Sequence, residues 1–193
     1  DPDAAVYWMM RMIDAGDDPL FVLRRMMIFA SEDVGNADPR ALSMAVDADR
    51  AFRRLGMPEG LYAMAQAATY LASAPKSNAA TVAWTRARQD VERYGALPVP
   101  LKLRNAPTRL MKEQGYGGGY RYPHDEPGAV AHGETYRPER LGPARYYEPT
   151  RHGLERHIAE RLARIRARTD EAEPQPEAER PSGTDDDPGD SSG

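Results

Sequence analysis

The stretch DPRALSMAVDADRAFRRLG, residues 38–56, carries the pattern that decides the fold. Its Asp-Pro start offers an N-cap oxygen, followed by a residue that loses no hydrogen bond in the first helical turn. Gly56 belongs to the residue type that ends helices at the lowest conformational cost. Between these ends, apolar side chains recur at helical spacing: Ala41, Ala45, Ala48, Phe52 and Leu55. The stretch therefore predicts a helix with one buried face.

The same signals repeat on both sides of this stretch. Asp18-Pro19 opens another segment, and Leu61 to Ala74 is an uncharged, alanine-rich run typical of a central helix with close neighbours. No stretch alternates convincingly with the period of a strand. Two further helical stripes consist of Leu20, Leu23, Met27, Ala30 and Val34, and of Ala80, Ala83, Ala87, Val91 and Tyr94. We therefore predict an all-α fold in which residues 1–95 form an array of about five helices.

Residues 96–150 differ from this array in being dense in Pro, Gly and Tyr. One short helix fits, at residues 108–114. The tyrosines are too many for a free linker, and we expect an irregular arm strapped over the helical body. A C-terminal helix at 151–168 follows from a last apolar stripe and would complete one domain over residues 1–168. The arm tyrosines are Tyr116, Tyr120, Tyr122, Tyr136, Tyr146 and Tyr147.

Charge is segregated along the chain. Residues 1–168 hold 25 Lys and Arg against 21 acids, whereas residues 169–193 hold nine acids and one Arg. The latter segment has no large apolar residue to offset the entropy of ordering, so we expect a disordered acidic tail. The longest uncharged helical run has 14 residues, short of the ~20 that span a bilayer, so no membrane partner is expected.

The sequence offers no catalytic, cofactor-binding or metal-ligating residues. It has no cysteine, which excludes disulfides, thiol catalysis and cysteine-based zinc sites. The glycine-rich run Gly115 to Gly119 lacks the Lys that a phosphate-binding loop requires. His124, Asp125 and Glu126 are adjacent, a spacing that rarely converges on one metal ion. We therefore expect no ATP turnover from this chain.

A basic segment is the first candidate for a binding role. It comprises Lys102, Arg104, Arg109 and Lys112, with Arg121 following between two tyrosines. Cations mixed with aromatic rings suit the phosphates and stackable bases of nucleic acid. The alternative is that these cations pair with acids of the first half of the chain or of a neighbouring subunit.

Tyr7, Trp8, Met9 and Met10 form the second candidate, because four large apolar side chains in a row cannot all hide on one helix face. We predict that part of this helix faces another subunit or a preceding portion of the protein. The chain begins with Asp rather than Met, and we expect it to be a piece of a longer protein.

Several strings resemble one known family. They are DPDAAVYW (1–8), ASEDVGNADP (30–39), APKSN (74–78), LPVPLKLRNAPTRLMK (97–112), GYG (115–117) and YRYPHD (120–125). Together they resemble the C-terminal region of the replication-associated recombination protein A family, AAA+ ATPases related to clamp loaders and to the Werner helicase-interacting protein. The chain departs from the family pattern at Glu126-Pro127-Gly128 and through 129–145, and the acidic tail is not part of that pattern. Neither the phosphate-binding loop nor the Asp-Glu box of the family's ATPase module is present.

The resemblance implies an all-helical domain that drives tetramer formation and presents ATPase modules to DNA at stalled replication forks. It implies single-stranded DNA or duplex ends as partners, possible work beside single-strand-binding protein, and a cytoplasmic, nucleoid-associated location. ATP and Mg would belong to the ATPase module. A different reading stays open from the residues alone: helix starts recur roughly every 20 residues, as in a free-standing helical-repeat scaffold for proteins.

Overall fold

The structure, a computed structural model, describes residues 1–172, and within that range it is all-α, as predicted. A π turn (Ala30–Val34) and a 3-10 turn (Gly35–Ala37) follow the second helix, and four further 3-10 turns lie in the arm. The α-helices in this range are α1 (Pro2–Asp14), α2 (Pro19–Phe29), α3 (Arg40–Leu55), α4 (Gly60–Ser73), α5 (Ala79–Tyr94), α6 (Arg109–Glu113) and α7 (Glu155–Ala172).

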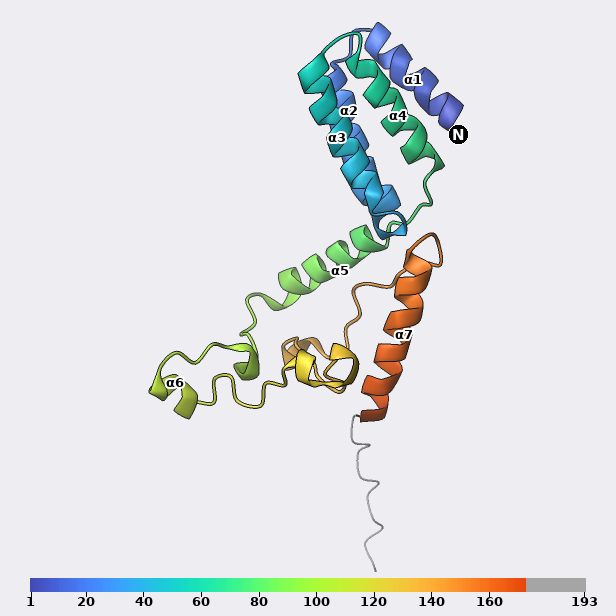
Figure 1. The fold of residues 1–193 in the computed structure, drawn as a ribbon. Coiled ribbons are helices and arrows are strands. Elements are labelled where there is room, and N and C mark those ends of the chain that lie inside the picture. Colours follow the sequence, from blue (N-terminus) through green and yellow to red (C-terminus); the bar gives the residue numbers. More distant parts are fainter. Residues whose placement is uncertain (173–193) are drawn as a thin grey trace, which may run out of the picture.

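Helices α1 to α4 pack together as a bundle at one end of the molecule (Figure 1). The uncharged helix α4 contacts α1, α2 and α3, which confirms its predicted central place. Alanines on α3 and α4 allow this close approach, and larger side chains fill the space between them. The buried core consists of Met9, Val22, Leu23, Ala48, Phe52, Met64, Ala67 and Ala68.

The start of α2 and the end of α3 follow the predicted local chemistry. The predicted start of α3 is wrong by one residue, because α3 begins at Arg40 with Pro39 as its N-cap, and Pro39 provides no side-chain cap. The Asp18 carboxylate accepts a hydrogen bond from the Leu20 N–H at 2.9 Å, as an N-cap should. On α3, Arg53 pairs with Asp49 at 2.7 Å, one helical turn away, and the Asp49 side chain is only 14% exposed. Gly56 ends α3 with φ of +70°, a conformation that is costly for residues with a side chain.

A second small core lies where the bundle meets the rest of the chain. Ala30 and Val34 of the π turn pack against Ala41, Ala45 and Leu71, and all five side chains are buried. From this end of the bundle α5 and α7 leave in different directions (Figure 1). Helix α5 fully buries none of its predicted apolar stripe: four of the five residues are half-buried, and Val91 is 67% exposed.

The arm, residues 96–150, does not lie over the bundle as we expected. Most of it lies beyond α5 and beside α7, apart from α1 to α4 (Figure 1). Its contacts to the helical array come late in the segment: Tyr146 donates to Asp90 at 2.8 Å, and Arg86 pairs with Glu148 at 3.1 Å. Two arm tyrosines pack against arm cations instead of against the bundle: Tyr116 against Arg104 and Tyr136 against Lys102.

Helix α7 runs to Ala172, four residues past the predicted end. The remainder of the predicted acidic tail, residues 173–193, lies outside the described residues. Among residues 1–172, no helix is long and apolar enough to cross a bilayer, and no group of three or more potential metal ligands converges.

Candidate functional site

The most deeply buried polar group of the described chain is the carboxylate of Glu155 at the start of α7, which is fully buried. Its Oε2 accepts hydrogen bonds from Ser77 Oγ at 2.6 Å, Thr150 Oγ at 2.7 Å and the Thr150 N–H at 2.8 Å. Its Oε1 accepts from the Tyr147 hydroxyl at 2.8 Å. Glu155, Ser77, Tyr147 and Thr150 thus tie three segments together, and we call this group the junction.

The electrostatics of the junction favour the ionised carboxylate. Burial alone would raise the pKa of Glu155, because a charge is poorly solvated there. Hydrogen bonds from Ser77, Thr150 and Tyr147 outweigh burial and hold that pKa below its usual value. Burial and the contact with Glu155 raise the pKa of the Tyr147 phenol, while a hydrogen bond from Asn36 opposes them. The carboxylate therefore stays charged and the phenol stays a donor.

Backbone contacts around the junction fix α7 on the bundle. The Ser77 N–H donates to the Asp33 carbonyl at 2.7 Å, and the Leu154 N–H donates to the Ala37 carbonyl at 2.8 Å. Gly153 has φ of +51°, and a Cβ there would overlap the Ala37 carbonyl. Only glycine permits this approach without a shift of the chain.

Asp38 anchors a second polar cluster beside the junction. Its carboxylate accepts from Arg40 Nε at 2.8 Å and from the Tyr70 hydroxyl at 2.6 Å. The hydrogen bond from Arg40 lowers the pKa of Asp38; burial opposes this, and Tyr70 adds to the lowering. The Lys76 ammonium donates to carbonyls at the end of α4, including Leu71 O at 2.9 Å, and burial lowers its pKa.

Three of the five predicted cations form ion pairs with acids of the arm. Lys102 forms an ion pair with Glu134, and Arg104 donates to the Val99 carbonyl at 2.7 Å and to the Tyr116 hydroxyl. Both cations are therefore held in place by the arm itself. The acid that pairs with Lys102 comes from the arm and not from the first half of the chain, where the alternative placed it.

The outer residues of the segment are more open. Arg109 pairs with Glu113 at 2.8 Å but is 93% exposed. Lys112 is exposed and has no ion pair within residues 1–172. Arg121 pairs with Glu126 at 2.8 Å and donates to the His132 carbonyl at 2.9 Å. The five predicted cations thus lie along one arm but do not form a single free surface.

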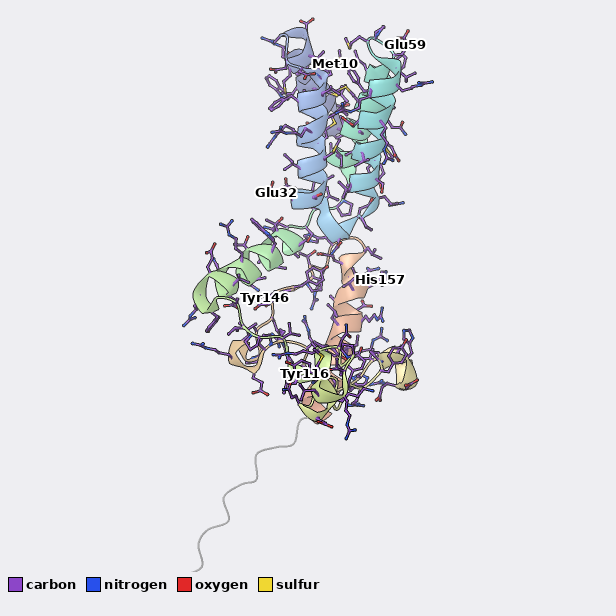
Figure 2. The ribbon with its side chains drawn as sticks, turned by 90° about the vertical axis from the view of Figure 1, so that its left-hand side faces the viewer. Met10, Glu32, Glu59, Tyr116, Tyr146 and His157 are labelled. Atoms are coloured by element: carbon purple, nitrogen blue, oxygen red, sulfur yellow. The ribbon has the colours of Figure 1, made fainter. Side chains whose placement is uncertain are left out.

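The predicted interface residues on α1 divide between the core and solvent. Met9 lies inside the bundle, 4% exposed, whereas Tyr7 and Trp8 are 61% and 62% exposed. The rings of Tyr7 and Trp8 meet edge to face with centroids 5.2 Å apart. Figure 2 shows Met10 near the outer end of the bundle and Tyr116 at the opposite end of the molecule, so the two predicted sites are well separated.

An apolar groove that the sequence analysis did not predict lies between α2, α3 and α5. It has a volume of about 590 Å³. Trp84 on its wall is 62% exposed, and Leu42 and Ile28 are 44% and 37% exposed. Trp84 follows Ala80 by four residues and precedes Ala87 by three, so it lies at the edge of the apolar stripe predicted for α5. The lining residues are Met27, Ile28, Ser31, Glu32, Leu42, Ala80, Thr81 and Trp84.

The sequence that forms this architecture matches a known protein family. Residues 1–166 match the family model described as MgsA AAA+ ATPase C terminal. The chain belongs to this family. The match covers the bundle, the arm and most of α7, so the junction and both predicted sites lie within the MgsA AAA+ ATPase C-terminal domain.

Relatives named as replication-associated recombination protein A share much of the sequence. The Coxiella burnetii protein is 55% identical over 162 residues, covering 84% of this chain and 37% of that protein. The Escherichia coli protein is 56% identical over 162 residues, covering 84% and 36%. A more distant relative, ATPase WRNIP1 of Dictyostelium discoideum, is 42% identical over 150 residues, covering 77% and 17%. The chain thus spans just over a third of the Coxiella burnetii and Escherichia coli proteins.

Proposed function

We propose that this chain is the oligomerisation domain of an AAA+ ATPase of replication-associated recombination, and that it assembles as a tetramer. The observation that carries this is the family match over residues 1–166, together with relatives named for that process. The exposed aromatic pair on α1 supports it. A specific interface buries on the order of 800 Å² per partner, with aromatic anchors at its centre.

In this proposal the domain brings ATPase modules near DNA, with single-stranded DNA or duplex ends as partners and single-strand-binding protein nearby. ATP and Mg belong to the ATPase module of the longer protein, and this chain turns over no nucleotide itself. The protein works in the cytoplasm on the nucleoid. The basic arm, with exposed Arg109 and Lys112, supports proximity to DNA.

The test is to replace the exposed aromatic residues of α1 and to measure the molar mass of the chain in solution. Tyr7→Ser with Trp8→Ser should lower the mass measured by light scattering below that of the unaltered chain. The matched control is Tyr62→Ser with Val91→Ser, which removes similarly exposed apolar side chains elsewhere (79% and 67% exposed) and should leave the mass unchanged. If the α1 variant keeps its full mass, the interface lies elsewhere, and the Trp84 groove becomes the next surface to alter.

A further inference from the structure

Three arginines of α7 lack the partners that the arm cations have. Arg161, Arg164 and Arg168 are exposed, and none makes a hydrogen bond or ion pair within the part of the chain that the structure describes. Their spacings of three and four residues place them on one face of the helix. Lys102 and Arg121, by contrast, are each paired with a glutamate of the arm. One face of α7 therefore carries three exposed positive charges that are unpaired within residues 1–172.

The three arginines line a hollow between α7 and the arm, which lie side by side in Figure 1. The hollow has a volume of about 360 Å³, and its other walls are Gly128, Val130, His132 and Ile165. The Nδ1 atom of His132 is buried without a hydrogen-bond partner in the described residues. A concave site with guanidinium groups on one side and an unsatisfied imidazole nitrogen in its wall suits an oxyanion.

We propose that Arg161, Arg164 and Arg168 bind consecutive phosphates of a single DNA strand. At a rise of 1.5 Å per residue, the three positions span roughly 10 Å along α7. A nucleic-acid strand carries about one charge per 3.4 Å of axis in a duplex, so this span covers about three phosphates. The inference deepens the proposed function, because it moves the DNA contact from the arm segment to α7.

Nearby aromatic rings favour a nucleotide strand over a free anion. Arg121 donates to the carbonyl of His132, which lines the hollow. The neighbours of Arg121 in sequence, Tyr120 and Tyr122, are 46% and 54% exposed. Exposed rings beside a cationic groove are how proteins hold single strands without sequence preference, since every base has a face that stacks.

The test measures fluorescence anisotropy of a labelled oligothymidylate of about 20 nucleotides, longer than the site of one small domain. The whole chain is compared with the triple variant Arg161→Gln, Arg164→Gln, Arg168→Gln over a series of NaCl concentrations. Three lost phosphate contacts should flatten the log–log salt slope by about 2 and weaken binding roughly 100-fold at 0.1 M salt.

The matched control is Arg24→Gln, Arg25→Gln, Arg156→Gln, which removes the same number of positive charges. Arg24 and Arg25 are exposed on α2, and Arg156 is exposed on α7, roughly 140° around the helix from Arg161. The control should bind within a few-fold of the unaltered chain. Thermal melting followed by circular dichroism checks that both variants fold, and Arg164→Glu alone serves as a second variant that should weaken binding by at least 10-fold.

Four results would overturn the inference. Equal losses in the triple variant and its control would mean that only net charge matters. A loss confined to Arg109→Gln with Lys112→Gln would return the contact to the arm and leave the proposed function standing. Binding of pyrophosphate, followed by calorimetry, without binding of the oligonucleotide would make the hollow a free-anion site. A tetramer that binds no DNA would contradict the inference but not the oligomerisation role.

Discussion

Removing the Glu155 carboxylate should release α7 from the bundle. In Glu155→Ala, four donors lose their acceptor at once: the hydroxyls of Ser77, Tyr147 and Thr150, and the Thr150 N–H. Each buried donor left unpaired costs about 1–3 kcal/mol, and water entering the space recovers part of that. We expect a loss of about 4 kcal/mol in the free energy that holds α7 in place.

Glu155→Gln separates charge from hydrogen bonding. Its amide oxygen can take the place of Oε2 and keep the donors from Ser77 and Thr150, while its NH₂ group faces Tyr147, whose hydroxyl can turn to accept. What is lost is the charge assistance of these bonds, about 1–2 kcal/mol in all. The matched control is Glu160→Gln on the same helix, where the carboxylate is 62% exposed. Its effect should stay within about 0.5 kcal/mol.

The assay is hydrogen exchange read by mass spectrometry, peptide by peptide. In Glu155→Ala the amides of α7 should exchange much faster than in the unaltered chain, while α1 to α4 keep their protection. This local pattern is expected because the strongest contacts of α7 with the bundle are at the junction and with the 3-10 turn Gly35–Ala37. If Glu155→Ala and Glu160→Gln give the same α7 exchange, the carboxylate does not hold the helix and the reasoning is wrong.

The other predictions concern the same region. Tyr70→Phe removes the hydroxyl that donates to buried Asp38 and should cost about 1.5–3 kcal/mol in urea unfolding, with an unchanged value arguing against that bond. Gly153→Ala should lower the melting temperature by several degrees, because the added Cβ would overlap the Ala37 carbonyl. An unchanged melting temperature would mean that the backbone at this turn shifts to accommodate the methyl group at no cost. The pKa values of Glu155 and Asp38 are lowered in the folded chain, so both carboxylates stabilise the fold when they are charged. This stabilisation is complete above the usual carboxyl pKa of about 4.3 and is lost as the pH falls below it. Melting temperatures measured over a pH series should therefore be constant from about pH 5 to 8 and fall below about pH 4.

Much of the helical framework could be predicted because its signals are local. Asp18 and Gly56 mark helix ends by hydrogen bonds and backbone angles within a few residues. The stripe on α3 follows from the helical period, and four of its five residues are buried while Leu55 is exposed. The path of the arm could not be predicted in this way, because tyrosine content indicates packing without saying against what.

The junction escaped the sequence analysis for a physical reason. A glutamate in the first turn of a helix is common, because its negative charge interacts favourably with the helix dipole whether or not the side chain is buried. Its partner Ser77 lies 78 residues earlier. The basic segment illustrates the opposite problem. Its composition suggested a free cation at Lys102, but Lys102 pairs with Glu134, which lies 32 residues further along the chain. Pairings over such distances depend on the fold and not on local pattern.

The most direct test of the account is the solution mass of the unaltered chain, measured by light scattering behind size exclusion across a range of protein concentrations. The account predicts a particle of four chains, each of 21.4 kDa, at tens of micromolar protein. A single sharp species with the mass of one chain over the whole range would contradict it and would favour a free-standing helical scaffold.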